Sequence, residues 1–288
     1  MHSVTAIVVA FDSAEALPEC LGALRAEEVA VIVVDNASGD DSAAVAERLG
    51  ARVIRNALNE GYGRANNIGA WAADSEFVLI VNPDVVVQPG TVAALLDAAD
   101  RYPDAALFAP KVVEPNGRVF YQPRSLLAGY LENPTGKLAV PAGEACAPFF
   151  SGACFLVRRE VFLKLGGFDE SIFLFYEDDD LCRRITDSQA ALVYVPQATV
   201  LHGRGRSSAP KPGLVFKSRW HQAWSRAYVS HKYGLYSPAA GMFIVNGLKT
   251  LGVALTGRRA LIERYGGSAA GALAYMRGKT ALKQEGLS

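Results

Sequence analysis

"LIVNPDVVV", residues 79–87, joins two apolar runs through the polar trio Asn82, Pro83 and Asp84. Continuous β-branched runs of this length are typical of strands that are buried on both faces of a sheet. Asparagine, proline and aspartate are the ordinary residues of a turn. A carboxylate directly after a buried strand is also where many enzymes hold a metal ion. The trio therefore predicts either a plain turn or a metal site, and the surrounding sequence has to decide.

Strand-like and helix-like segments alternate around this stretch. We expect strands at residues 4–10, 29–35, 51–56, 76–82 and 105–110, and helices at residues 14–24, 42–50, 63–73 and 89–103. This alternation is typical of α/β proteins with a mostly parallel sheet flanked by helices, which is a Rossmann-like arrangement.

Polar residues follow four consecutive predicted strands. Phe11-Asp12 ends the first strand, Asp35 the second, and Asn82 to Asp84 the fourth, while Asn59 to Gly61 follows the third. Ligands of such sheets bind beyond the carboxyl ends of the strands. Each of these residues alone could be a cap or a turn. Together they predict a pocket lined by polar side chains.

The second half of the chain is less regular. Residues 114–148 are rich in proline and glycine and predict a loop, and residues 149–170 predict a strand and a short helix. We place a boundary near residue 210, which gives a catalytic domain at 1–210 and a helical appendage at 211–288. Within the appendage, residues 216–234 predict a helix.

Residues 238–257 are about as long as a bilayer-spanning helix. Asn246 and Lys249 lie in the middle of this segment, and four glycines interrupt it. A helix that lies on a surface, or packs as part of the appendage, is therefore favoured over a membrane span.

Two sequence features point to chemistry. Glu177, Asp178, Asp179 and Asp180 follow the apolar-aromatic run SIFLFY. Acids favour a helix N-terminus, but a carboxylate cluster behind a buried segment can also have a raised pKa and act as a general base. His202 follows a β-branched run, and an imidazole with a carboxylate suits a divalent cation.

The segment NEGYGRANNIG, residues 59–69, could face an anion with the backbone N–H groups of Gly61 and its neighbours, and Arg64 adds a charge there. It matches neither the Rossmann fingerprint nor a Walker loop. A simple loop-to-helix turn explains it equally well.

Composition excludes some classes of function. The 288 residues carry 29 basic and 29 acidic side chains, so nothing favours binding of nucleic acid. The apolar run near the N-terminus is short and has no basic leader, so we expect a first strand and not a signal peptide. The four cysteines form no CxxC pair, which favours reduced thiols.

These motifs in their order resemble the family 2 glycosyltransferases, and most closely the bacterial rhamnosyltransferase-like branch. The resemblance rests on IVVAFDSAEALPECLGAL, VIVVDNASGDDS, NEGYGRANNIG, LIVNPDVVV, FFSGACFLVRREVFLKLGGFDE, YEDDDLCRR and YVPQATVLHGRGRSS, which together cover about residues 4–208. It implies a GT-A fold and a hexosyltransferase that inverts configuration, depends on Mg²⁺ or Mn²⁺, and uses a nucleotide diphosphate sugar.

The resemblance also implies roles for individual residues. Asp178 corresponds to the catalytic base, supported by Glu177, and Asp84 and His202 correspond to metal ligands. The expected nucleotide-binding residues are Phe11, Asp12, Asp35, Gly61, Arg64, Asn67 and Asn82. Two positions depart from the family pattern: Asn82 replaces the first acid of its metal motif, and Asp12 stands where this branch usually has asparagine.

Donor and acceptor are expected from the resemblance as well. The donor would be dTDP-rhamnose or another dTDP- or UDP-sugar, and the acceptor a hydroxyl of a cell-envelope polysaccharide or lipid-linked glycan. We expect a cytoplasmic protein that works at the inner face of the membrane. The aromatic and basic residues 216–288 could contact that membrane, cap the fold or form a homodimer surface.

Two other functions stay open at this point. A sugar nucleotidyltransferase also combines a parallel sheet with a metal-binding acid, but it usually has a glycine-rich phosphate loop after the first strand. Residues 10–17 read AFDSAEAL instead. The other alternative is a non-catalytic homologue that binds a nucleotide sugar.

Overall fold

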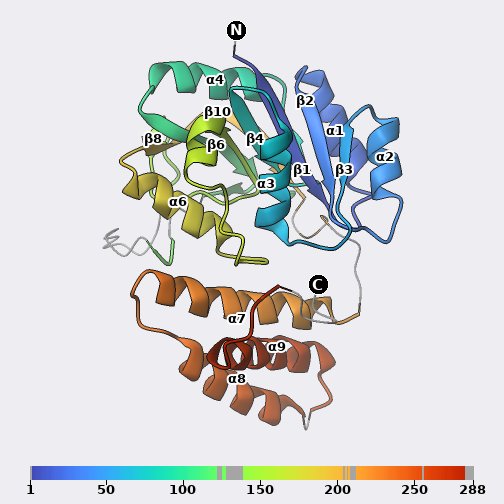
Figure 1. The fold of residues 1–288 in the computed structure, drawn as a ribbon, viewed down its shortest axis with the longest axis vertical. Coiled ribbons are helices and arrows are strands. Elements are labelled where there is room, and N and C mark those ends of the chain that lie inside the picture. Colours follow the sequence, from blue (N-terminus) through green and yellow to red (C-terminus); the bar gives the residue numbers. More distant parts are fainter. Residues whose placement is uncertain are drawn as a thin grey trace.

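The computed structural model describes residues 2–121, 125–127, 139–203, 205, 207, 212–254 and 256–282. It consists of an α/β unit and, below it in Figure 1, a layer of three helices. The predicted α/β architecture with a helical C-terminal part is confirmed. The proposed boundary near residue 210 lies outside the described residues.

The first half of the chain forms the parallel part of the sheet. Strands β1 (Val4–Ala10), β2 (Ala30–Asp35), β3 (Arg52–Arg55) and β4 (Phe77–Val81) pair in parallel in the order β3-β2-β1-β4. Helices α1 (Leu17–Ala26), α2 (Ser42–Arg48) and α3 (Tyr62–Ala72) connect them. Pro18 lies in the first turn of α1, where its missing N–H leaves no helical hydrogen bond unmade.

Beyond β4 the sheet is mixed and not mostly parallel. Strand β9 (Cys154–Arg158) inserts antiparallel between β4 and β6 (Ala105–Val113), and β6 pairs in parallel with β10 (Ala191–His202). Two short strands, β7 (Val119–Phe120) and β8 (Ala145–Cys146), lie within the predicted loop at 114–148 and pair with β6 and β10. Helix α4 (Thr91–Arg101) precedes β6, and α5 (Arg159–Lys164) and α6 (Glu177–Asp187) follow β9.

The stretch 79–87 is a strand, a turn and a second strand. β4 ends at Val81, and β5 (Val85–Val87) pairs antiparallel with the last residues of β10. β10 has a register shift between Val195 and Thr199 and continues as one irregular strand as far as His202. The Gly203 N–H then donates to the backbone oxygen of Asp84 at 2.8 Å. The end of β10 is thereby fastened to the polar trio.

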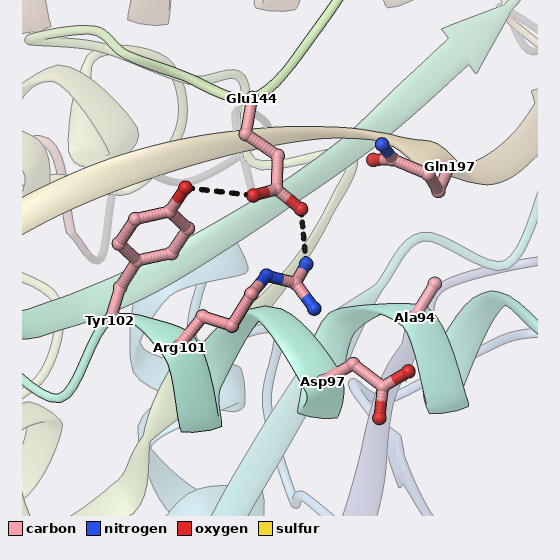
Figure 2. A pocket seen from close by; sticks show the side chains of 6 residues that line it. All are labelled: Ala94, Asp97, Arg101, Tyr102, Glu144 and Gln197. Atoms are coloured by element: carbon pink, nitrogen blue, oxygen red, sulfur yellow. Dashed lines mark hydrogen bonds and ion pairs between the residues drawn. The ribbon is translucent and has the colours of Figure 1, made fainter.

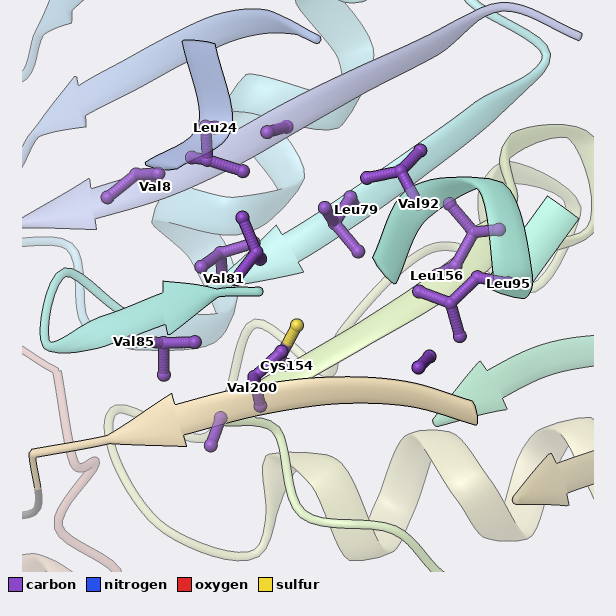
Figure 3. Close-up of a cluster of buried hydrophobic side chains, with 14 of the residues drawn as sticks. Val8, Leu24, Leu79, Val81, Val85, Val92, Leu95, Cys154, Leu156 and Val200 are labelled. Atoms are coloured by element: carbon purple, nitrogen blue, oxygen red, sulfur yellow. The ribbon is translucent and has the colours of Figure 1, made fainter. Parts of the chain in front are cut away.

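The core lies on both faces of the sheet. Successive residues of β1 and β4 alternate between two buried clusters, which is why both strands read as unbroken apolar runs. Figure 3 shows one cluster, in which Leu24 of α1 and Leu95 of α4 pack on Val8, Leu79 and Leu156 of the strands. Helices α3, α5 and α6 cover the opposite face with Ala65, Phe162 and Leu181.

Three helices, α7 (Leu214–Lys232), α8 (Ala239–Ala254) and α9 (Arg259–Met276), form the lower layer. α7 packs against the α/β unit and α9 lies against α7. Their backbones come close because Gly267 and Gly271 have no Cβ: one added at Gly271 would lie 2.1 Å from the backbone oxygen of Trp220. Of the helices in the described part of the chain, none combines the length and apolar content needed to span a membrane.

Candidate active site

A cavity of about 590 Å³ lies between the carboxyl ends of the parallel strands and α7. The chain reaches it from several elements: Phe11 follows β1, Asn36 follows β2, Asn82 follows β4, and Asp178 belongs to α6. α7 closes it with Leu214, Lys217, Ser218 and His221. Strand ends and a C-terminal helix thus enclose a space of the size that small-molecule ligands occupy.

Asp178 lies in the wall of this cavity. Its Oδ2 accepts a hydrogen bond from the Gly152 N–H at 2.9 Å, and its Oδ1 accepts one from the Asp179 N–H at 3.0 Å. Burial raises the pKa of Asp178, and these two hydrogen bonds oppose the rise. A carboxylate that is fixed in position and more basic than usual can take a proton from a bound hydroxyl.

The backbone before α6 sets the direction of this carboxylate. Phe175 and Tyr176 both have φ of 69°, a left-handed conformation that is unfavourable for large side chains. Such strain persists only where surrounding structure imposes it, and it gathers at functional sites. The reversal turns the first residues of α6 toward the cavity, and the helix dipole favours acids there.

The four acids of this turn have different surroundings. Glu177 lines the cavity, and burial followed by repulsion from Asp178 raises its pKa well above the usual value. Asp179 accepts hydrogen bonds from the Ser125 hydroxyl at 2.6 Å and the Leu126 N–H at 3.0 Å. The acid run therefore splits into a cavity-facing pair and structural members.

Asp180 is the structural anchor of the run. Its carboxylate is fully buried and accepts hydrogen bonds from Arg184 at 2.8 Å, Lys232 at 2.6 Å and Tyr233 at 2.8 Å. Lys232 also bonds Asp169 at 2.6 Å. α7 is thereby tied to the helix that carries Asp178.

The two predicted metal ligands lie together. His202 Nε2 is 3.5 Å from Asp84 Oδ1, and the hydroxyl of Ser207 donates to the same Oδ1 at 2.7 Å. One imidazole and one carboxylate at this separation can share a cation. No group of three or more histidine, cysteine, aspartate or glutamate residues suited to a metal occurs in the described part of the chain. A cation here would need oxygen ligands from a bound molecule.

Three buried oxygens of predicted site residues have no hydrogen-bond partner among the described residues: Asp35 Oδ1, Asn82 Oδ1 and Glu177 Oε2. Asn82 and Glu177 line the cavity. Asp35 is the last residue of β2, and the next residue, Asn36, lines the cavity as well. Orphaned buried acceptors are costly, so they mark positions where a ligand is expected to donate hydrogen bonds.

Phe11 and Gly61 also line the cavity, whereas Asp12 does not. Asp12 Oδ1 accepts the Gly39 N–H at 2.8 Å, which joins the loop after β1 to the loop after β2. Gly61 has φ of 83°, and a Cβ there would lie 2.4 Å from the backbone oxygen of Phe173. Glycine is required at this position because the two backbones nearly touch.

Arg64 and Asn67, both predicted to bind the nucleotide, are not among the residues that line the cavity. The Asn67 amide is buried and bonds the backbone of Phe168 twice, donating to its oxygen at 2.9 Å and accepting from its N–H at 2.8 Å. Arg64 pairs with Glu60 at 2.9 Å and Glu170 at 3.5 Å at the surface. The Asn67 side chain thereby fixes α3 to the loop before α6.

Several cavity residues were not predicted from the sequence. The Tyr62 hydroxyl donates to the backbone oxygen of Gly152 at 2.6 Å, so it braces the loop that holds Asp178. Lys217 and His221 come from α7, and His221 stacks on Phe173 with ring centroids 4.3 Å apart. Their spacing of four residues on a predicted helix was the available signal, since it places both on one face.

A second hollow lies beside α4, away from the strand ends. Figure 2 shows its lining, in which Glu144 accepts hydrogen bonds from Arg101 and, at 2.8 Å, from the Tyr102 hydroxyl. Burial would raise the pKa of Glu144, but these two partners lower it. An acid with a lowered pKa and satisfied oxygens is a structural ion pair, so we assign no chemistry to this hollow.

The glycosyl transferase family 2 model matches residues 5–166, over half of the chain. The chain belongs to glycosyl transferase family 2. Its predicted membership and GT-A fold are confirmed, and it is a glycosyltransferase by family.

Two relatives of this family 2 glycosyltransferase are rhamnosyltransferases. N-acetylglucosaminyl-diphospho-decaprenol L-rhamnosyltransferase of Mycobacterium tuberculosis is 33% identical, over 69% of this chain and 78% of the relative. Rhamnosyltransferase WbbL of Escherichia coli is 24% identical, over 60% and 71%. Among solved structures, mannosyltransferase PcManGT from Pyrobaculum calidifontis in complex with GDP-Man and Mn²⁺ has a TM-score of 0.58 at 16% identity, over 96% of this chain and 88% of that one. This last likeness concerns the fold.

Proposed function

We propose that this family 2 glycosyltransferase moves rhamnose from dTDP-rhamnose to a hydroxyl of a lipid-linked glycan in cell-envelope synthesis. The observation that carries the proposal is the position of Asp178, a partly buried carboxylate of raised pKa in a cavity with unsatisfied acceptors. The choice of sugar and acceptor rests on the relative that is 33% identical, whose name specifies rhamnose and a decaprenol-linked acceptor.

Transfer proceeds with inversion in this proposal. Asp178 takes the proton of the acceptor hydroxyl as that oxygen attacks the anomeric carbon. A C–O bond forms, and the bond to the diphosphate breaks on the opposite face, with the electron pair leaving on the diphosphate. The Gly152 and Asp179 N–H groups hold Asp178 in place throughout. Glu177 supports Asp178 or contacts the acceptor.

Asp84 and His202 would hold Mg²⁺ or Mn²⁺. A carboxylate and an imidazole with 3.5 Å between Oδ1 and Nε2 fit such an ion, and diphosphate and water oxygens would complete its ligands. When bound, the ion neutralises charge on the departing diphosphate. The Ser207 hydroxyl, which now bonds Asp84, orients that carboxylate.

The nucleotide would occupy the strand-end side of the cavity. Asp35 and Asn82 each present a buried oxygen without a partner among the described residues, which suits N–H or hydroxyl donors of the base, ribose or sugar. Phe11 and Gly61 line the space beside them. Asp12 acts by holding two of the surrounding loops together. Arg64 lies at the surface, where a phosphate of the donor would replace Glu60 as its partner.

A sugar nucleotidyltransferase is set aside because the chain belongs to glycosyl transferase family 2. A non-catalytic homologue would keep the cavity without using Asp178. In our proposal the protein acts in the cytoplasm at the inner face of the membrane, where a lipid-linked acceptor would be found.

The test is a panel of nucleotide sugars with purified protein, a diphospho-lipid GlcNAc acceptor, and Mn²⁺, Mg²⁺ or a chelator. We expect dTDP-rhamnose to be the preferred donor, the chelator to abolish transfer, and the product to have the opposite anomeric configuration to the donor. Equal use of dTDP- and UDP-sugars would contradict the donor assignment. Retention of configuration would contradict the mechanism.

A further inference from the structure

The outermost helix exposes several large apolar side chains. Five large side chains of α8 are exposed by 37–70%, and we call them the α8 stripe: Phe243, Ile244, Val245, Leu248 and Leu251. Positions 244, 248 and 251 repeat at helical spacing, so they lie along one face. Isolated exposed apolar residues need no explanation, but a contiguous stripe marks an interaction surface.

The opposite side of α8 is anchored to the protein. α8 lies against α9 and is the helix farthest from the sheet (Figure 1). Lys249 Nζ lies 5.5 Å from the centre of the Tyr265 ring, and Thr250 lies beside Gly266 of α9. Ile244, Leu248 and Leu251 lie on the opposite side of α8 and therefore face away from α9.

The charges around the stripe are basic. The segment that follows α8 has three basic residues, Arg258, Arg259 and Arg264, and one acid, Glu263. Glu263 pairs with Arg259 at 3.2 Å, which leaves a net positive surround. Apolar side chains flanked by cations complement an anionic bilayer surface, where the stripe enters the acyl region and the cations meet phosphate groups.

We propose that the α8 stripe docks this protein on an anionic lipid bilayer, with α8 lying in the plane of the interface. At 16 residues the helix is too short to cross the bilayer, but long enough to lie on it. The biological role of this docking rests on the proposed function, since docking would bring the cavity to a lipid-linked acceptor. The docking itself needs neither substrate nor metal.

Vesicle co-sedimentation without nucleotide or acceptor tests the docking. Vesicles contain equal parts of phosphatidylglycerol and phosphatidylcholine, or phosphatidylcholine alone. We expect the double variant Leu248→Glu, Leu251→Glu to lower the bound fraction at least about tenfold. Leu58→Glu is the matched control, since Leu58 is 64% exposed and Leu248 65%, and it should stay within about twofold of wild type.

The basic surround predicts a second difference. Wild-type binding should be stronger on the anionic vesicles than on phosphatidylcholine and should weaken with added salt. A bound fraction that is the same for wild type and the double variant overturns the proposal. If the double variant unfolds by circular dichroism, Leu248→Ser with Leu251→Ser provides the comparison, with the same expected loss.

Light scattering on the soluble protein separates a lipid partner from a second copy of the chain. If wild type is a dimer that fails to bind vesicles, and the double variant is a monomer, the stripe is a dimer interface and the proposal is overturned. Failure of the proposed function would leave vesicle binding intact and abolish transfer to a detergent-solubilised acceptor. The two failures are therefore distinguishable.

Discussion

Lys232→Met tests whether α7 is held to the catalytic helix by charge. Lys232 lies 2.6 Å from both Asp180 and Asp169, and its side chain is 29% exposed. Burial alone would lower the pKa of this lysine, but the hydrogen bonds to the two carboxylates raise it. The methionine keeps most of the length of the side chain and removes the charge, so Asp180 loses one of its partners.

Removing one member of a buried ion pair typically costs about 3–5 kcal/mol. Asp180 keeps Arg184 and Tyr233, and Lys232 is partly solvated, so we expect a loss of about 2–4 kcal/mol in the free energy of unfolding. Urea denaturation followed by circular dichroism measures it. Lys164→Met, at an exposed lysine of α5, is the control and should change stability by less than about 0.5 kcal/mol.

Lys232→Met should also lower nucleotide-sugar turnover, because α7 forms one wall of the cavity and Asp178 lies on the helix that Lys232 holds. A Lys232→Met protein as stable as the Lys164→Met control would refute the reasoning that this ionic cluster fastens α7. The position of α7 would then depend on its apolar contacts alone.

Three further substitutions test the site and its frame. Burial, and then repulsion from a neighbouring acid, raises the pKa of Asp179 from 3.8 to about 7, so wild-type stability should fall as pH rises between these values. Asp179→Asn should make this slope shallower in urea melts, while Glu177 and Asp178, whose pKa values are also raised, keep part of it. An unchanged slope would disprove the contribution of Asp179. Gly61→Ala should lower the free energy of unfolding by about 3 kcal/mol, because its Cβ would meet the Phe173 backbone. Gly50→Ala is the control, since Gly50 has a similar φ but open space around it, and it should cost about 1 kcal/mol. Equal losses of stability in denaturant unfolding would exclude the clash. His202→Ala should raise the Mn²⁺ concentration for half-maximal transfer at least about tenfold, and an unaltered titration would remove His202 from the metal site.

The parallel half of the fold could be predicted from the sequence because its signal is local. Apolar β-branched runs, each followed by a helix-like segment, determine β1 to β4, and helix spacing determines α1 to α3. The antiparallel insertion of β9 between β4 and β6 could not be predicted, because strand pairing depends on contacts far apart in the sequence. The continuation of β10 through Pro196 could not be predicted either, because it depends on a register shift between Val195 and Thr199 in the pairing with β6.

The site divides in the same way. Strand ends and helix starts place Phe11, Asn82 and Asp178 at one cavity, as the order of motifs indicates. Asn67 was expected at the nucleotide because of its motif, but its amide hydrogen-bonds the backbone of Phe168. Only the folded loop reveals this contact. The α7 wall was missed for a similar reason, since its part in the cavity depends on how the helical layer packs against the strand ends.

The most direct test of the central claim is transfer of rhamnose by wild type and Asp178→Asn under identical conditions. The amide can still accept the Gly152 hydrogen bond but cannot take a proton, so we predict a fall of about a thousandfold in turnover with binding of dTDP unchanged. Asp97→Asn on α4 is the control and should keep wild-type turnover. Transfer by Asp178→Asn at the wild-type rate would contradict the assignment of Asp178 as the base.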